Sequence, residues 1–291
     1  MGIVNVTPDS FSDGGLWFDE GRAVAHGLEL VAEGADLLDV GGESTRPGAA
    51  AVGEAEELRR VLPVIRRLAD VSGVPVSVDT RHAAVARAAV GEGACIVNDV
   101  TPLDSDGAMA AVIRETGAGV VAMHTRGTPQ TMARHAVYGD VVADVEAALC
   151  AVLAYAEAQG IAREQVVVDP GIGFAKDTAQ NMALLAATAR FARVAPVLVG
   201  VSRKRVIGEL CGEPVASERA GGSVGAAVWC GLQGAAVVRV HDVKATRQAL
   251  TVVAALAGMK DERSHHQNHK GAEDAEMLLT GLTGFCSAFN L

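Results

Sequence analysis

Eight short apolar runs recur along the chain, and a longer segment of helical character follows each of them. The runs are Ile3-Val4, Leu37-Leu38, Val76-Ser77-Val78, Cys95-Ile96-Val97, Gly119–Ala122, Val166–Val168, Val197–Val199 and Ala236–Val238. Uninterrupted apolar runs of this length are typical of parallel strands that are buried on both faces. The pattern therefore predicts an α/β fold in which each strand leads into a helix.

The number of strand–helix units narrows the choice of α/β fold. We expect the helices at 19–32, 54–68, 83–90, 108–115, 141–158, 179–189, within 203–232, and at 245–256. Eight such units predict a (β/α)8 barrel, the TIM barrel. The alternative is a doubly wound open sheet, which more often has about five or six strands, and no GxGxxG sequence opens the first unit here. We therefore favour the barrel.

Composition agrees with a single barrel domain. The chain has 291 residues, 49% of them apolar and only 3% aromatic, so the core consists mainly of Val, Ala and Leu. Its net charge of −10 argues against a nucleic-acid partner, although a local basic pocket for an anionic ligand remains compatible with it. The sequence contains no apolar run of roughly 20 residues that would cross a membrane.

Cysteine usage suggests the cellular compartment, and the end of the chain suggests the domain limits. The five cysteines are scattered and lack CxxC spacing, which indicates neither a disulfide framework nor a zinc site and favours the reducing cytoplasm. The N-terminus shows no signal-peptide pattern. We predict a barrel over 1–258 and a mobile tail over 259–291. His265, His266 and His269 resemble a metal cluster, but we interpret them as part of a solvated tail.

Polar residues stand where the apolar runs end. In chain order they are Asn5, Asp39, Asp79, Asn98-Asp99, Met123-His124, Asp169, Ser202-Arg203-Lys204, and Arg239 with His241. The carboxyl ends of barrel strands converge on one rim, where barrel enzymes have their active sites. Helix capping is the alternative explanation for Asp, Asn and Ser. It does not account for Lys204, Arg239 or His241, because cations are unfavourable at a helix N-terminus.

These residues divide into two chemistries. The acceptor-rich set is Asp79, Asn98 and Asp169. Carboxylates of this kind suit the guanidine-like edge of a pterin or a guanine. The second set is Asn5, Thr45, Arg46, Arg239 and His241. It suits a diphosphate accompanied by a divalent cation. Lys204 could reach either ligand.

Two polar, glycine-rich loops follow the first two predicted strands. The first runs over Thr7–Gly15 and contains Phe11, and the second runs over Gly41–Gly48. Either could be an ordinary surface turn, but the length of the second and its Arg46 favour loops that close over the barrel mouth. The segment Gly221–Gly225 matches GxSxG, yet no strand precedes it as a nucleophile elbow requires, so we interpret it as the start of a helix.

Eight segments together resemble the dihydropteroate synthase family, in order and at matching strand ends. They are MGIVNVTPDSFSDGG, DVGGESTRPGA, VSVDT, VNDV, VAMHTRGTPQTM, VVVDPGIGFAKD, VGVSRKRVIGE and VVRVHDV. The resemblance spans residues 1 to about 258. It implies an Mg²⁺-dependent transferase of folate biosynthesis that condenses 4-aminobenzoate with (7,8-dihydropterin-6-yl)methyl diphosphate to 7,8-dihydropteroate. It also implies competition by sulfonamides, which mimic 4-aminobenzoate, and a homodimer.

The resemblance also implies a role for each matching residue. The pterin ring would be held by Asp79, Asn98, Asp169 and Lys204 and lined by Met123 and Phe174. The diphosphate would meet Thr45, Arg46, Arg239 and His241, with Asn5 as the contact to Mg²⁺. The 4-aminobenzoate pocket would be shaped by Phe11, Pro47 and Ser202. We expect Asp79, Lys204, Arg239 and His241 to be catalytic in an SN1-like loss of diphosphate.

The chain departs from the family pattern in two places, and two rival functions remain. The first strand begins at the chain start, where relatives usually have an earlier β segment, so the barrel floor could be less covered or the true start missing. Arg205 stands where many relatives have serine.

One rival function is a methyltetrahydrofolate–corrinoid methyltransferase, but Arg46, Arg239 and His241 count against it. The other is a non-catalytic pterin-binding paralogue, which the intact loops and Lys204 disfavour.

Overall fold

The computed structural model describes residues 1–7, 20–44, 49, 51–101, 103, 107–128 and 130–264; of 259–264 it gives the helical backbone alone. Among the described residues, no helix combines the length and apolar character needed to cross a membrane.

The strands form a closed parallel barrel. Six of them pair in chain order, namely β1 (Gly2–Asn5), β2 (Leu38–Gly41), β3 (Val76–Asp79), β4 (Ile96–Asp99), β5 (Gly119–Met123) and β6 (Val166–Asp169). The last two, β7 (Leu198–Val199) and β8 (Val237–Val238), pair with each other. A parallel bridge between Val168 and Val197 joins β6 to β7, and one between Gly2 and Val240 joins β8 to β1. The predicted barrel is confirmed, and the open-sheet alternative is wrong.

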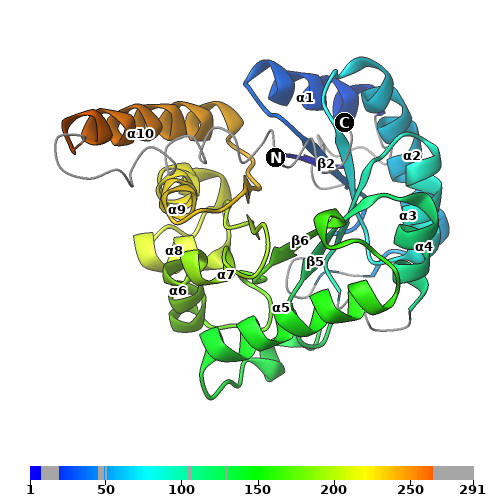
Figure 1. Ribbon diagram of the computed structural model, residues 1–291. Coiled ribbons are helices and arrows are strands. Elements are labelled where there is room, and N and C mark those ends of the chain that lie inside the picture. The colour runs from blue at the N-terminus through cyan, green and yellow to red at the C-terminus, as the bar shows by residue number, and fades with distance from the viewer. Residues whose placement is uncertain are drawn as a thin grey trace.

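The helices surround the strands as an outer ring (Figure 1). They are α1 (Glu20–Ala32), α2 (Glu54–Val71), α3 (Ala83–Gly91), α4 (Ala108–Thr116), α5 (Val141–Ala158), α6 (Thr178–Ala186), α7 (Thr188–Phe191), α8 (Arg205–Cys211), α9 (Ala220–Leu232) and α10 (Val243–Ser264). Short 3-10 turns are η2 (Met132–His135), η3 (Arg163–Gln165) and η4 (Ala216–Arg219). Helix α10 runs through position 258, and residues 265–291 lie outside the described residues.

Local sequence explains several helix boundaries. The Asp140 carboxylate accepts the N–H groups of Val142 and Ala143 at the start of α5, and Asp177 accepts the N–H of Gln180 at the start of α6, so both are N-caps. The segment 203–232 divides into α8, η4 and α9 because Gly212, at φ +66°, ends α8 in the left-handed conformation.

Along most strands, alternate residues belong to two different apolar cores. The inner core fills the barrel and consists of Met1, Leu37, Ile96, Val121, Val167, Leu198 and Val237. Their strand neighbours, such as Val120 and Val168, belong to the larger core between the strands and the helices. This is the expected result of side chains that alternate across a strand. The barrel is therefore packed at its base, and a ligand can only enter from the rim above.

Candidate active site at the carboxyl ends of the strands

A layer of mainly polar side chains stands directly above the inner apolar core. Its members follow inner-core residues by two positions, and they are Asp39 after Leu37, Asn98 after Ile96, Met123 after Val121, Asp169 after Val167, and Arg239 after Val237. Asp79 holds the same place on β3, two residues after the buried Ser77. Because a two-residue step returns to the same face, these groups share the barrel mouth.

Arg239 connects the strands of this layer through charged hydrogen bonds. Its Nε donates to Asp39 Oδ2 at 2.6 Å, and its Nη2 donates to Asp79 Oδ2 at 2.8 Å. Asn98 Nδ2 donates to the same Asp39 oxygen at 3.0 Å. Arg239, which we grouped from the sequence with the anion-binding residues, is thus also bonded to two acceptor carboxylates. The guanidinium offsets part of the cost of burying both.

Asp39 is the site residue that sequence reasoning left without a role. We expected the second strand to end there, but β2 continues to Gly41, so Asp39 lies inside it. The residue is fully buried, and its Oδ1 has no hydrogen bond among the described residues. An aspartate within the apolar run 37–40 was the available signal, since a buried carboxylate needs partners elsewhere in the fold.

Burial shifts the pKa values of three charged groups of the site toward neutrality. It raises the pKa of Asp79 to about 7, with the Arg239 guanidinium acting in the opposite direction and Asp39 adding to the rise. Burial likewise raises the pKa of Asp169. It lowers the pKa of Lys204 to about 8, against the attraction of Asp169. Perturbed groups that converge at one barrel mouth are typical of a functional site.

Lys204 and Phe174 form one wall of the site. Lys204 Nζ donates to the carbonyl oxygen of Ile172 at 2.6 Å and lies 4.9 Å from the centroid of the Phe174 ring. Asp169 Oδ1 accepts the N–H of Gly171 at 2.7 Å, so the loop after β6 turns back over its own strand end. The wall therefore combines a cation, a carboxylate and an aromatic face, which together suit a flat heterocycle.

Ser202 and His241 join the loops after β7 and β8. Ser202 Oγ lies 3.0 Å from His241 Nδ1 and accepts the backbone N–H of His241 at 3.1 Å. Asn5 ends β1, where it pairs in register with Gly41 of β2. Four other predicted site residues, Phe11, Thr45, Arg46 and Pro47, lie outside the described residues.

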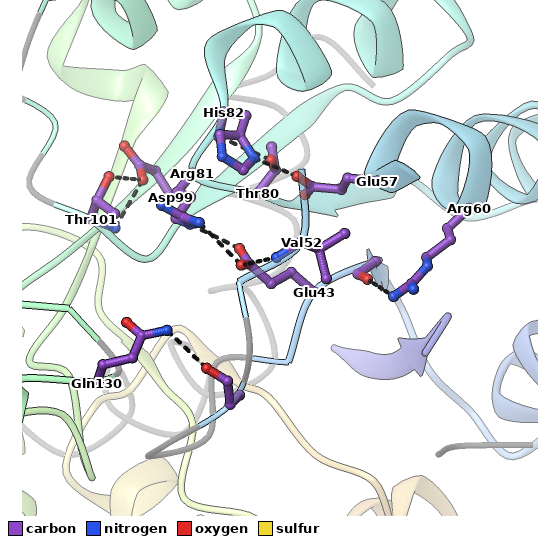
Figure 2. Close-up of polar contacts among 12 residues, drawn as sticks. Glu43, Val52, Glu57, Arg60, Thr80, Arg81, His82, Asp99, Thr101 and Gln130 are labelled. Carbon is purple, nitrogen blue, oxygen red and sulfur yellow. Dashed lines mark hydrogen bonds and ion pairs between the residues drawn. The ribbon is translucent and has the colours of Figure 1, made fainter. Parts of the chain in front are cut away.

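The described ends of the second loop are anchored to neighbouring elements (Figure 2). The Glu43 carboxylate accepts Arg81 Nε at 2.8 Å and Nη2 at 3.1 Å, and it also accepts the N–H of Val52 at 2.9 Å. Gln130 Nε2, from the loop after β5, donates to the carbonyl oxygen of Ala49 at 2.8 Å. Both sides of segment 45–48 are therefore fixed next to the rim.

One group among the described residues could hold a metal ion. Glu43, Glu57 and His82 place one ligand atom each within 4.8 Å of one another. Glu57 Oε2 lies 2.6 Å from His82 Nδ1, and Glu57 Oε1 is buried without a hydrogen-bond partner among the described residues. Arg81 already neutralises Glu43, which lowers the attraction for a cation. Our prediction of a metal contact concerned Asn5 and did not include this group.

The loop after β6 is held by close backbone contacts. Lys176 is buried, and its Nζ donates to the carbonyl oxygens of Gly171 at 3.0 Å and Phe174 at 2.8 Å. Gly171 adopts φ +69°, and a Cβ atom there would lie 2.0 Å from the carbonyl oxygen of His124. Glycine is required at this position for both reasons.

Comparisons with known proteins identify relatives of the chain. Residues 1–241 match the family described as pterin binding enzyme. Dihydropteroate synthase of Escherichia coli strain K12 is 46% identical over 266 residues, which are 91% of this chain and 94% of that protein.

Solved structures show the same similarity. The structure of Xanthomonas albilineans dihydropteroate synthase with 4-aminobenzoic acid is 50% identical with a TM-score of 0.83, covering 88% of this chain and 91% of that chain. The Yersinia pestis enzyme with a sulfonamide drug complex is 43% identical with a TM-score of 0.83, covering 88% and 93%.

Substitution of Gly171 by Ala should destabilise the protein far more than the same change at Gly73. Both glycines have φ near +70°, but nothing lies within 4 Å of a Cβ at Gly73. We expect Gly73→Ala to cost about 1–2 kcal/mol from backbone strain alone. Gly171→Ala must also displace a carbonyl group, so at least about 3 kcal/mol is expected in urea unfolding followed by circular dichroism. Equal losses would contradict the close contact with His124.

Proposed function

Because the chain belongs to the pterin-binding enzyme family, we propose that the polar layer at its barrel mouth carries out the dihydropteroate synthase reaction. The enzyme is a transferase that condenses (7,8-dihydropterin-6-yl)methyl diphosphate with 4-aminobenzoate, giving 7,8-dihydropteroate and diphosphate. The observation that supports this function most directly is the group of buried acceptors beside Lys204 and Arg239 at one rim. We propose 1–258 as the catalytic barrel and 259–291 as a tail.

The pterin ring is proposed to occupy the space between the acceptors and the Lys204–Phe174 wall. The carboxylates of Asp79 and Asp169 accept N–H groups of the pterin edge, and the Asn98 amide can both donate and accept. Phe174 covers one ring face, and Met123, buried at the end of β5, lines the slot. Lys204 donates to a pterin acceptor atom, because its ammonium group has more than one N–H.

The diphosphate is proposed to leave toward Arg239 and His241. Ser202 Oγ accepts the His241 backbone N–H and can donate its own proton to Nδ1, which leaves the imidazole proton on Nε2 for the anion. Arg239 contributes positive charge near the bond that breaks. Thr45 and Arg46 would add contacts to the same anion. Departure before attack, an SN1-like course, leaves a cationic methylene that Asp79 and the electron-rich pterin stabilise.

Asn5 fits the proposed Mg²⁺ contact by its chemistry. A side-chain amide oxygen at a partly exposed strand end is a hard ligand, and Mg²⁺ usually combines one or two protein oxygens with water and substrate phosphates. When bound, the ion would supply charge that neutralises the leaving diphosphate. The residues of the protein bind, orient and shield the pterin whether or not that charge is present.

4-Aminobenzoate is proposed to enter above Ser202, with Phe11 and Pro47 completing its pocket. The sulfonamide complex of the Yersinia pestis relative supports sulfonamides as competitors for this pocket. Arg205, exposed at the start of α8, is near enough in sequence to Lys204 to attract the aminobenzoate carboxylate. We also propose a cytoplasmic location, which the free cysteines Cys150, Cys211 and Cys230 support.

Diphosphate release tests the proposed function against its rivals. The purified chain should release diphosphate and form dihydropteroate only when the pterin diphosphate, 4-aminobenzoate and Mg²⁺ are all supplied, and a chelator should abolish the reaction. A coupled phosphate assay with chromatography of the product measures both. Pterin binding without turnover would identify a non-catalytic paralogue, and methyl transfer from methyltetrahydrofolate to a corrinoid would identify the methyltransferase.

Pterin affinity should fall as the pH drops below about 7. Asp79 must be ionised to accept the pterin N–H groups, and its raised pKa means that it is protonated in the empty site below that pH. Calorimetry from pH 5.5 to 8.5 should approach a tenfold loss of affinity per pH unit at the acid end. Asp79→Asn should bind weakly and without this slope. Asp36→Asn, which breaks only the exterior pair with Arg247, should retain it. A slope that survives in Asp79→Asn would exclude Asp79 as its source.

A homodimer is proposed through the outer faces of α9 and α10. Trp229, Leu232, Val252 and Leu256 are 47–58% exposed there, which is unusual for large apolar residues on neighbouring helices. The double substitution Val252→Glu and Leu256→Glu should raise the dimer dissociation constant at least about tenfold in sedimentation velocity, because it buries charge in the interface. Val137→Glu, 75% exposed on another part of the surface, should leave it unchanged. A monomeric wild-type chain would overturn the proposal.

A further inference from the structure

The turn between β7 and α8 contains a residue in an unfavourable backbone conformation. The N–H of Lys204 donates to the carbonyl oxygen of Val201 at 3.2 Å and closes a four-residue turn. Arg203, the third residue of this turn, has φ +59°. Glycine or asparagine normally occupies such a position, because the Cβ atom of other residues crowds the backbone there. A strained arginine persists only where its surroundings hold it.

Two residues of a neighbouring segment hold both backbone polar groups of Arg203. Its N–H donates to Ser223 Oγ at 2.9 Å, and its carbonyl oxygen accepts Arg219 Nη1 at 3.1 Å. Ser223, on α9, is only 2% exposed, and its Oγ donates in turn to the carbonyl oxygen of Arg219 at 2.7 Å. The side chain of Arg203 is fixed separately by Asp242, at 3.1 and 2.5 Å.

Glycines on α8 and α9 allow these two helices and Arg219 to approach closely enough for this support. A Cβ at Gly208 would lie 2.5 Å from Arg219 Nε, and one at Gly222 would lie 2.6 Å from Ile207 Cγ2. Arg219 is fixed further by the carbonyl oxygens of Glu213 at 2.9 Å and Pro214 at 2.6 Å. Within the Gly221–Gly225 segment these contacts account for Gly222 and Ser223, whereas a Cβ at Gly221 or Gly225 would meet nothing within 4 Å. The Ser223 hydroxyl is occupied by two backbone groups, so the GxSxG match does not indicate a nucleophile.

The neighbours of Arg203 on either side are the two site residues of this turn. Ser202 contacts His241, and Lys204 reaches across to Ile172 and Phe174. Both contacts require the backbone to reverse direction at Arg203. If Arg203 relaxed to negative φ, the direction of the following peptide would change, and with it the origin of the Lys204 side chain.

We propose that Ser223 and Arg219 are positioning residues that hold Arg203 in the left-handed conformation and thereby place Ser202 and Lys204 at the barrel mouth. This inference rests on the proposed function, since the two placed residues are assigned there to the aminobenzoate pocket and the pterin slot. It adds α9, an outer helix, to the elements that determine the geometry of the site.

A double-mutant cycle with kinetics on the purified full chain tests the proposal. Ser223→Ala should raise KM at least about fivefold for both the pterin diphosphate and 4-aminobenzoate, with a smaller fall in kcat per folded molecule. Loss of folded protein alone would lower the apparent kcat and leave KM unchanged. In an Arg203→Gly background, Ser223→Ala should change either KM by less than about twofold, because glycine adopts the turn without support.

Thr116 provides a matched control at the opposite end of the barrel. Its Oγ1 donates to the carbonyl oxygen of Val112 four residues back and accepts the N–H of Ala118, as Ser223 does for Arg219 and Arg203. Thr116→Val should therefore leave both KM values within about twofold of wild type. If Ser223→Ala cannot be purified, Ser223→Cys, which keeps the size with a weaker acceptor, enters the same cycle.

Two results would overturn the proposal. Wild-type KM values in Ser223→Ala would show that the support is unnecessary, and an equal rise in the Arg203→Gly background would show that it acts elsewhere. A wild-type chain that forms no dihydropteroate would instead contradict the proposed function itself.

Discussion

Alternation of side chains along eight parallel strands is the constraint on which the whole site depends. One face of every strand must meet the helices, so the other face must fill the barrel. Apart from Ser77 on β3, the lower inward positions are apolar, and they pack into a closed base. The next inward positions, two residues later, are the first that solvent and ligands can reach. Polar residues at these positions on different strands therefore lie close together, and no loop is needed to bring them there.

The polar layer is costly to bury, and the pattern of contacts shows how the fold limits that cost. Asp39, Asp79 and Asp169 are all buried near one another, and an isolated carboxylate in such a place would be strongly destabilised. Arg239 is bonded to two of them, while Lys204 attracts Asp169. These cations compensate the buried carboxylate charges only in part, since the pKa values of Asp79 and Asp169 stay above the usual range. A ligand that brings N–H donors would complete it, which is consistent with a guanidine-like pterin edge.

The rim itself is shaped by residues that do not face the ligand space. Lys176 fixes the loop after β6 through backbone carbonyl groups, and Glu43 joins the base of the second loop to Arg81, two residues beyond Asp79. Ser223 acts on the turn after β7. Lys176 and Ser223 bond to loop backbone, and Glu43 bonds both to Arg81 and to the N–H of Val52, so buried and half-buried side chains hold each loop in place.

Apolar periodicity and turn chemistry are local properties, so the eight strand–helix units, their order and the polar residue near each strand end could be predicted from the sequence alone. The sequence also contained the motifs that resemble the family. That Asp39 lies inside β2 and shares Arg239 with Asp79 could be seen only in the folded protein, since these residues are 40 to 200 positions apart and meet through barrel closure. The same holds for Ser223, whose hydroxyl supports Arg203 twenty residues away because α9 packs closely against α8. A sequence pattern reports which residues share a face of one element, whereas pairing between elements depends on how the strands close and the helices pack.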